Sequence, residues 1–317
     1  MIQYKTKLSS TLPKIKNVDE LADLLTVNAK LLYLISNNIS SWYKCFQIPK
    51  RNGSMRNIEA PFPYLKKIQK RINEHILSSF ALHDRASAFI PGKNIRYNAS
   101  FHVNKSTILN CDIQNFFPSL KSFAIFNFFK AATNYPSDVI IILTKLCTLD
   151  DHLPQGAPTS PVLSNLLMYQ IDNNLFSWAK EHNLSYSRYA DDLTFSGNID
   201  NVIQKTILKK VKQNLATLNL KLNAQKTKCY NNNRRQLVTG LVVNQKVGIP
   251  REDIRKLRTY IHYIKLDITK GTFKYNPQEF EHNLGLLNYY CSINILNENL
   301  FQWRKLMLDI QKKYKNI

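Results

Sequence analysis

The stretch SRYADDLTFSG, Ser187–Gly197, places two adjacent aspartates between two short runs in which apolar and polar residues alternate. Alternation of this kind is typical of β-strands, so the stretch predicts a β-hairpin over 185–196 with Asp191 and Asp192 at its tip. A solvated turn is the simpler interpretation of the pair when it is taken alone. Because adjacent side chains of a strand point apart, Asp191 is the stronger candidate for a shared site and Asp192 the weaker one.

A third aspartate, Asp112, is the only acidic residue between Asp84 and Asp138, and it lies near the end of a predicted buried strand, Ile108–Ile113. If this strand and the hairpin belong to one sheet, the three carboxylates meet at one edge of it. Clustered carboxylates repel each other unless a cation neutralises them. Mg²⁺ binds carboxylates together with substrate phosphates, and two ions about 3.5–4 Å apart serve phosphoryl transfer. The three aspartates therefore predict a site for two Mg²⁺ ions, with Mn²⁺ as a substitute.

The composition predicts a polyanionic partner. The 317 residues include 44 Lys and Arg against 22 Asp and Glu, a formal net charge of +22, which fits nucleic acid or an anionic membrane. The best apolar run, DVIIILTKLC, is too short to span a bilayer and contains Lys145, and the first residues lack the apolar core of a secretory signal. We therefore expect a cytoplasmic protein with no membrane contact. The five scattered cysteines, read as reduced thiols, are Cys45, Cys111, Cys147, Cys229 and Cys291.

Periodicity along the chain predicts a mixed α+β fold. A pair of short helices is expected over 18–38, a hairpin over 43–61 around an Asn52-Gly53 turn, and an amphipathic basic helix after it. Helices are predicted over 121–132, 137–149, from Pro161 to His182, and over 201–218. Strands are expected over 220–231 and 236–249, and the chain from 250 onward is predicted to be helical and basic.

Three motifs in this order resemble those of reverse transcriptases. YADD (189–192) resembles their catalytic hairpin, CDIQNFFPSL (111–120) their first aspartate motif, and LPQGAPTSPVLSN (153–165) the segment that supports the template and the incoming nucleotide. Two shorter segments are similar to retron signatures: NASFH (98–102) to NAxxH, and VTG (238–240) to the triplet of that name. Each of these short segments has a plain structural alternative, with Asn98 as a helix cap, His102 as a packed core residue and Gly240 as a β-bulge.

The resemblance runs from about Tyr43 to Asn244 and implies a right-hand polymerase with fingers, a palm whose antiparallel sheet carries helices on one face, and a helical thumb. The expected boundaries are an N-terminal helical segment over 1–40, fingers over 41–105, and a region over 119–185 shared between fingers and palm. The palm is expected over 106–118 and 186–245, and the basic thumb over 246–317.

The resemblance also implies roles at the catalytic centre. Asp112, Asp191 and Asp192 correspond to the metal ligands, and the backbone carbonyl of Ile113 is expected to assist them. Phe117 occupies the place of a steric gate against the 2′-hydroxyl of ribonucleotides, whereas its neighbour Phe116 is assigned to core packing.

Further residues are expected to contact the nucleotide or the RNA. Lys50 and Arg56, with Arg51 as a third candidate, are placed over the triphosphate, and a solvated basic face is the alternative. Lys226, with Lys228 as its rival, is similar to the lysine that protonates pyrophosphate. Gln155 and Gly156 are expected against the nucleotide, and 237–243 as the primer grip. The signature residues are assigned to RNA binding or to the family signature alone: Asn98, Ala99, His102, Val238, Thr239 and Gly240. Tyr289, Tyr290 and Trp303 are candidates for base stacking, for which core packing is the simpler interpretation.

The function that the resemblance implies is an RNA-directed DNA polymerase of a retron. Such an enzyme binds its own structured non-coding RNA, primes from a guanosine 2′-hydroxyl, and uses deoxynucleotides to make a branched RNA–DNA product, msDNA, within an anti-phage defence system. A separate effector protein is expected, because polymerase and thumb fill the 317 residues. The alternatives are a group II intron-like or other mobile-element reverse transcriptase, and a non-catalytic RNA-binding protein on the same scaffold.

Overall fold

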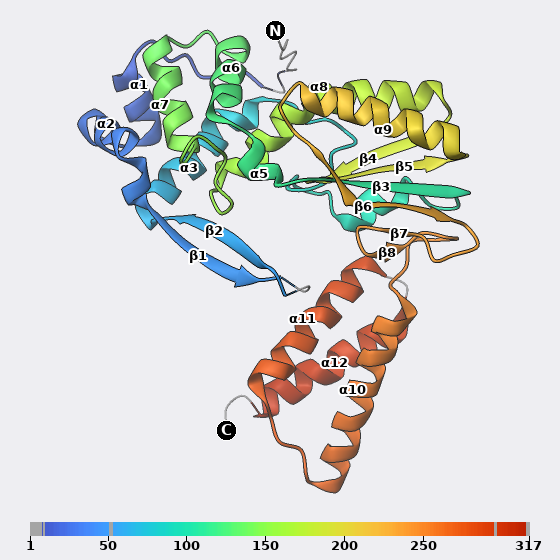
Figure 1. Cartoon of the computed structure of the whole chain (residues 1–317). Coiled ribbons are helices and arrows are strands. Elements are labelled where there is room, and N and C mark those ends of the chain that lie inside the picture. The colour runs from blue at the N-terminus through green and yellow to red at the C-terminus, as the bar shows by residue number, and fades with distance from the viewer. Residues whose placement is uncertain (1–7, 9, 51–52, 295–296, 315–317) are drawn as a thin grey trace.

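The computed structural model describes residues 8, 10–50, 53–294 and 297–314. The chain forms a helical region near the N-terminus, a long β-hairpin beside it, a central antiparallel sheet and a helical region near the C-terminus (Figure 1). The α+β class predicted from periodicity is confirmed.

The first region contains the predicted pair of short helices, α1 (Val18–Leu25) and α2 (Ala29–Asn37). The side chain of Asn17 caps α1 by accepting a hydrogen bond from the backbone N–H of Glu20 at 2.9 Å. The other helices of this region are η1 (Ile39–Trp42), α3 (Pro63–His75), η2 (Leu77–Ser79), α6 (Ser122–Ala132) and α7 (Ser137–Cys147).

The β-hairpin of strands β1 (Tyr43–Pro49) and β2 (Met55–Pro61) extends from this region and confirms the hairpin expected over 43–61. Lys50 and Ser54 close its end, where the Lys50 N–H donates to the Ser54 carbonyl at 2.7 Å. The candidate Arg51 and the first residue of the predicted turn, Asn52, lie outside the described residues. Gly53, the second residue of that turn, has a left-handed φ of 81°.

The central sheet has the strand order β4-β5-β3-β6, and every pairing in it is antiparallel. The strands are β3 (Thr107–Ile113), β4 (Ser185–Tyr189), β5 (Asp192–Gly197) and β6 (Leu222–Asn231). Helices α8 (Thr159–Glu181) and α9 (Asn201–Ala216) cover one face of it (Figure 1). Their apolar residues join β3, β4, β5 and the N-terminal helices in one buried cluster, which leaves the opposite face for the site.

One local prediction was wrong. The segment 236–249 forms no continuous strand but a tight hairpin of β7 (Leu237–Val238) and β8 (Leu241–Val242). Thr239 and Gly240, both left-handed with φ of 48° and 83°, form its turn and reverse the chain. After β3 the chain turns at Asn115, also left-handed with φ of 46°, into the short helix α5 (Phe116–Ser119).

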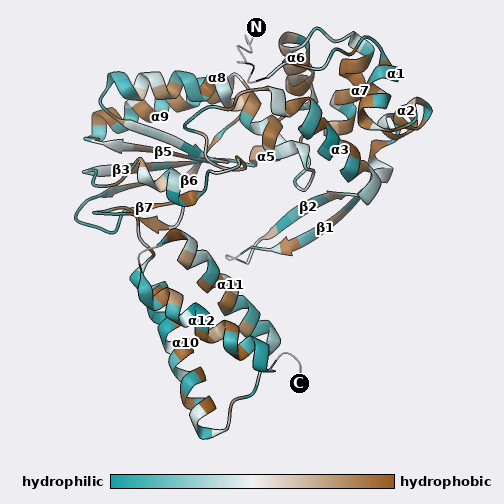
Figure 2. Cartoon of the chain, turned by 180° about the vertical axis from the view of Figure 1, so that it is seen from behind, coloured by the Kyte–Doolittle hydropathy of each residue, from teal (hydrophilic) through white to brown (hydrophobic). Residues whose placement is uncertain are grey.

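The C-terminal region consists of α10 (Arg251–Lys270), α11 (Pro277–Ile293) and α12 (Glu298–Tyr314). A second buried cluster ties these helices to Val238 and Leu241 of the tight hairpin and to Ala99 of α4 (Ile95–Ser100). Figure 2 shows hydrophilic residues along much of α10 and hydrophobic ones along α7. Helix α10 is therefore a polar, largely solvent-facing element that is anchored to the sheet through one apolar stripe.

Candidate active site

The sheet brings the three predicted aspartates to one place. In the β3–β5 register Asp112 stands opposite Asp192, and the backbone N–H of Ile113 donates a hydrogen bond to the Asp191 carbonyl at 3.0 Å. Asp112 is buried, whereas Asp191 is partly buried and Asp192 is exposed. Residues 80 positions apart in the chain thus share one end of the sheet because β3 pairs antiparallel with the second strand of the hairpin.

A buried arginine fixes the turn that carries Asp191. Ala190 has a left-handed φ of 56°, which is uncommon for a residue with a Cβ. Its carbonyl accepts a hydrogen bond from Arg188 Nη1 at 3.0 Å, and the same nitrogen donates to Asn165 Oδ1 at 3.0 Å. The remainder of the guanidinium pairs with Asp172 of α8, with Nη2 2.6 Å from Oδ2 and Nε 2.8 Å from Oδ1. The hairpin that carries Asp191 is therefore held against α8 by these hydrogen bonds.

The electrostatics at the tip favour a cationic partner. Partial burial raises the pKa of Asp191, with repulsion from Asp112 adding to it and the charges of Lys226 and Arg56 opposing it. For Asp192, loss of hydration and then repulsion from Asp191 and Asp112 raise the pKa to about 7, although the residue as a whole is exposed. Bringing these carboxylates together therefore has a cost, which a bound cation would offset.

Lys226 supplies part of that positive charge. Its Nζ lies 2.8 Å from Asp112 Oδ2, and this hydrogen bond is the main cause that raises the pKa of Lys226. Lys226 and its predicted rival Lys228 both line a cavity of about 430 Å³ that also contains Asp112 and Asp192. The structure thus brings both lysine candidates to the carboxylates, but only Lys226 is paired with one.

The carboxylates of the site are chemically suited to a divalent metal, but their side chains are not arranged around one in this structure. Carboxylate oxygens with raised pKa values are hard ligands of the kind that Mg²⁺ prefers. Among the described residues, however, no group of three or more His, Cys, Asp or Glu side chains is close enough together to hold an ion. Asp112 is instead paired with Lys226.

The two basic candidates lie at the same end of the β-hairpin, where Arg56 of β2 pairs with Ile48 and Lys50 follows Pro49. Both are exposed. The charge of Arg56 acts to lower the pKa of Asp191. Of this pair, Arg56 is therefore the one with an electrostatic influence on the aspartates.

Gln155 and Gly156 are held by Glu59 of β2. The backbone N–H of Gln155 donates to Glu59 Oε2 at 3.1 Å, and the Glu59 N–H donates to the Gln155 carbonyl at 3.1 Å. Gly156 has a φ of 152°, and a Cβ at this position would lie 2.5 Å from the Glu59 carbonyl oxygen. The absence of a side chain at this glycine therefore allows the backbone to approach β2 closely, and the expected contact of Gly156 with the nucleotide stays a prediction.

The two adjacent phenylalanines divide as the sequence suggested. Phe116 is buried in the core, with 4% of its surface exposed, whereas Phe117 is partly exposed. The Phe117 ring packs between Phe116, 5.4 Å away, and Phe89, 6.2 Å away, measured between ring centroids. Its position five residues after Asp112, on the helix that follows β3, leaves part of the ring open.

The NASFH signature is internal. Asn98, Ala99 and His102 are fully buried, so their side chains cannot contact RNA directly in this structure. His102 donates to or accepts from Ser187 and Ser196 at 2.7 Å each and so bridges β4 and β5 at the base of the catalytic hairpin. Burial lowers the pKa of His102 to about 3, which keeps the ring neutral. The packed-core alternative thus describes His102.

The VTG signature stands beside the carboxylates. Thr239 and Gly240 line the same cavity as Asp112, while Val238 is buried beneath them. Asn110 of β3 fixes this hairpin, since its Nδ2 donates to the Leu237 carbonyl at 2.8 Å while its Oδ1 accepts from Thr194 at 3.1 Å. Gly240 is a turn residue and not the β-bulge considered as an alternative.

The aromatic candidates near the C-terminus differ in exposure. Tyr290 and Trp303 pack against the buried cluster of α10–α12, whereas Tyr289 is 42% exposed. Of the three, Tyr289 is the most exposed to solvent.

Sequence reasoning missed Arg188, Asp172, Asn110 and Glu59, which position the predicted site residues. For Arg188 and Asn110 the available signal was a charged or amide residue inside an otherwise apolar or alternating strand, as in TILNCDI (107–113) and SYSRYADD (185–192). A polar side chain in such a place is buried and needs a specific partner. The partner itself is not visible in the sequence.

Comparison with known families sets the class of protein. Residues 48–243, more than half of the chain, match the family described as "Reverse transcriptase (RNA-dependent DNA polymerase)". With the α+β architecture, this match defines a right-hand polymerase with fingers, palm and thumb that copies RNA into DNA from deoxynucleotides.

Curated relatives narrow the class. The chain is 32% identical over 291 residues to the retron Ec86 reverse transcriptase of Escherichia coli, covering 89% of this chain and 86% of that protein. It is 34% identical to the retron Mx65 enzyme of Myxococcus xanthus, over 69% of this chain and 55% of that protein. The retron Se72 enzyme of Salmonella heidelberg is 32% identical, over 84% of this chain and 71% of the relative. The chain belongs to the retron-type bacterial reverse transcriptases.

No helix in the described part of the chain is long and apolar enough to cross a membrane.

Proposed function

We propose that this reverse transcriptase copies part of its own structured non-coding RNA, primed from the 2′-hydroxyl of a guanosine in that RNA, into a branched RNA–DNA molecule, msDNA. The observation that carries the catalytic part is the register that sets Asp112 opposite Asp192, with Asp191 beside them and Lys226 paired to Asp112. The product, the priming site and a role in anti-phage defence with a separate effector are proposed from what membership of the retron family implies, and the relatives support that membership.

In this proposal Asp112 and Asp191, with Asp192 completing the set, hold two divalent ions, Mg²⁺ or in its place Mn²⁺. Ions bound there would activate the primer hydroxyl and neutralise charge on the triphosphate. Asp112 would release Lys226 when it binds an ion, which frees the Lys226 ammonium to protonate the departing pyrophosphate. The raised pKa values of Asp191 and Asp192 support this assignment, because cation binding relieves the repulsion behind them.

The remaining contacts complete the nucleotide site. Arg56 stabilises charge on the triphosphate, with Lys50 as a second cation once the hairpin closes over it. Phe117 lies under the sugar and excludes a 2′-hydroxyl, and the backbone carbonyl of Ile113 assists the carboxylates. Gln155, held by Glu59, faces the nucleotide and template, and 237–243 guides the primer end.

The division of labour within the fold follows from these roles. We assign the N-terminal helices and the β1–β2 hairpin to the fingers, the central sheet with α8 and α9 to the palm, and α10–α12 to the thumb. The basic thumb would bind RNA mainly through phosphates, so affinity should fall as salt rises. Tyr289, with its exposed ring, is the best placed of the thumb aromatics for stacking on a base. The cytoplasm is the compartment in which we place the enzyme.

The experiment is co-expression of the chain with its flanking non-coding DNA, followed by isolation of short DNA. We expect branched DNA whose mobility changes on RNase treatment, and its loss in Asp191→Asn. Asp309→Asn, an exposed aspartate of α12, is the matched control and should leave the product unchanged. Product from the Asp191→Asn variant would contradict the catalytic assignment, and product without the non-coding RNA would contradict the retron assignment.

A further inference from the structure

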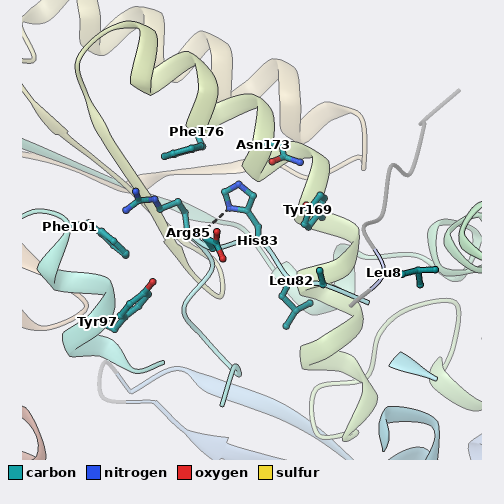
Figure 3. Close-up of a pocket in the computed structure, with 11 residues that line it drawn as sticks. Leu8, Leu82, His83, Arg85, Tyr97, Phe101, Tyr169, Asn173 and Phe176 are labelled. Atoms are coloured by element: carbon teal, nitrogen blue, oxygen red, sulfur yellow. Dashed lines mark hydrogen bonds between the residues drawn. The ribbon is translucent and has the colours of Figure 1, made fainter. Parts of the chain in front are cut away.

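A second cavity, of about 820 Å³, lies apart from the catalytic one and shares no lining residue with it. Its walls come from the loop 81–85, from α4 and from one face of α8, and Leu8 lies at its rim (Figure 3). None of the roles assigned above uses this cavity.

Arg85 is its central cation. The guanidinium lies 4.2 Å from the centre of the Phe101 ring and 5.0 Å from that of Phe176, so the two rings hold it from opposite elements. Within the described residues the guanidinium has neither an ion-pair partner nor a hydrogen-bond acceptor. An arginine that is fixed by aromatic faces and keeps its donors free is suited to a phosphate.

Aromatic and amide groups converge on the same space. Tyr97 is 37% exposed and meets Phe101 edge to face, with 5.0 Å between ring centroids. From α8, the Tyr169 hydroxyl and the Asn173 amide face the cavity, and neither has a hydrogen-bond partner in the part of the chain that the structure describes. Rings for stacking, together with unsatisfied donors and acceptors, are the groups that recognise an unpaired nucleobase.

The other titratable groups in and around the cavity are His83, Lys93 and Asp84. Burial lowers the pKa of His83, whose Nδ1 accepts a hydrogen bond from the Arg85 N–H at 3.1 Å, so this ring is a neutral wall. Lys93 Nζ donates to the carbonyls of Asp84 and Ala86 at 2.9 and 3.2 Å and lies 5.3 Å from the centre of the Tyr97 ring. Among the described residues that line the cavity, Arg85 is the one cation and Asp84 the one carboxylate, and Lys93 lies behind Tyr97 as a second nearby cation.

Helix α4 separates this cavity from the catalytic one. Ile95 of α4 lines the candidate catalytic cavity, whereas Tyr97, two residues further along α4, and Phe101, just after its end, line the second. The net charge of +22 favours a polynucleotide over a free nucleotide as the occupant, because a chain of phosphates can contact further basic residues outside the cavity.

We propose that the cavity binds one unpaired nucleotide of a single-stranded RNA segment, with the base against Tyr97 and Phe101 and a flanking phosphate on Arg85. This inference rests on the proposed function, since an enzyme that uses a structured RNA must hold single-stranded parts of it. It adds a recognition site outside the catalytic cavity. The same nucleotide chemistry occurs in a free mononucleotide, so the test includes both.

The experiment measures binding of a fluorescent single-stranded RNA of about 12 nucleotides to the full-length protein over a salt series. The variants are Tyr97→Leu and Arg85→Gln, and Arg96→Gln, an exposed arginine of α4 outside the cavity, is the matched control. We expect about fivefold to tenfold weaker binding for each cavity variant, and a salt slope lower by about one for Arg85→Gln. Tyr97→Leu should leave binding of a blunt RNA duplex unchanged, because a duplex offers no unpaired base. Thermal unfolding checks that each variant is folded.

A photocrosslink from 4-thiouridine RNA to Tyr97, Phe101 or Asn173 would support the inference. Wild-type affinity in both cavity variants, with crosslinks only elsewhere, would overturn it. Adenosine monophosphate that competes at concentrations close to those of the RNA would also overturn it in favour of a free nucleotide. Extension of oligo(dT) on poly(rA) by the unaltered protein is measured in parallel, so that failure of the proposed polymerase function is recognised separately.

Discussion

Replacement of Arg188 by Met is predicted to destabilise the protein, because it removes the hydrogen bonds that hold the turn before Asp191. Arg188 and Asp172 are both fully buried, and the guanidinium makes hydrogen bonds to Asp172, Asn165 and the Ala190 carbonyl. Methionine fills a similar volume but leaves the Asp172 carboxylate buried with one remaining hydrogen bond, from Tyr186 at 2.7 Å. Removing one partner of a buried ion pair typically costs about 3–5 kcal/mol. This is a large fraction of the ~5–15 kcal/mol by which proteins are stable.

The assay is denaturant-induced and thermal unfolding of the full chain. At roughly 2–4 °C per kcal/mol, a loss of about 4 kcal/mol lowers Tm by about 8–16 °C. Arg96→Met, at an exposed position, should stay within about 0.5 kcal/mol of wild type. The double variant Arg188→Met/Asp172→Asn removes both charges and keeps an acceptor for Tyr186, so it should recover a large part of the loss.

Arg188→Lys provides the functional readout. A lysine keeps the charge but cannot reach Asp172, Asn165 and the Ala190 carbonyl together. We expect a smaller loss of stability and a clear loss of polymerisation rate, because the turn before Asp191 is no longer held. A stability of Arg188→Met within about 1 kcal/mol of wild type would refute this reasoning, as would a double variant less stable than Arg188→Met.

Three further predictions concern single positions. His102 is neutral in the folded protein, with a pKa of about 3, whereas the unfolded chain takes up a proton below about pH 6.5. The free energy of unfolding should therefore fall as pH drops from 6.5 toward 3, by about 2 kcal/mol at pH 5. Unfolding of His102→Asn, measured over the same pH range, should lack this component. Gly156→Ala should cost at least about 1–3 kcal/mol in denaturant unfolding, since its φ of 152° and the 2.5 Å approach to Glu59 leave no room for a Cβ; a neutral result would contradict the close packing on β2. Lys226→Gln should slow single-turnover extension by about 100-fold or more while Tm stays near wild type, and an equal loss in Lys228→Gln would remove the distinction between the two lysines.

The sequence by itself determined the local elements and indicated which carboxylates are the candidates for catalysis. The hairpin around Asp191, the strand that ends near Asp112 and the paired helices α1 and α2 follow from periodicity and turn residues, which act over a few neighbouring positions. The prediction was wrong for 236–249, where the φ-positive pair Thr239-Gly240 turns an expected strand into a hairpin. Periodicity reports the faces of an element, but it does not report where a left-handed turn divides one.

Only the tertiary structure decided what holds the carboxylates in place. Arg188 meets Asp172 across 16 positions, His102 meets Ser187 across 85, and Glu59 meets Gln155 across 96. These partners come together because α4, α8 and β2 pack around the sheet in one arrangement. A local sequence pattern does not show which distant polar group will hydrogen-bond to a given buried side chain. The cavity around Arg85 arises in the same way, from three segments that are unremarkable when each is read alone. The sequence therefore indicates the candidate catalytic residues, and the packing of the folded chain decides which residues position them.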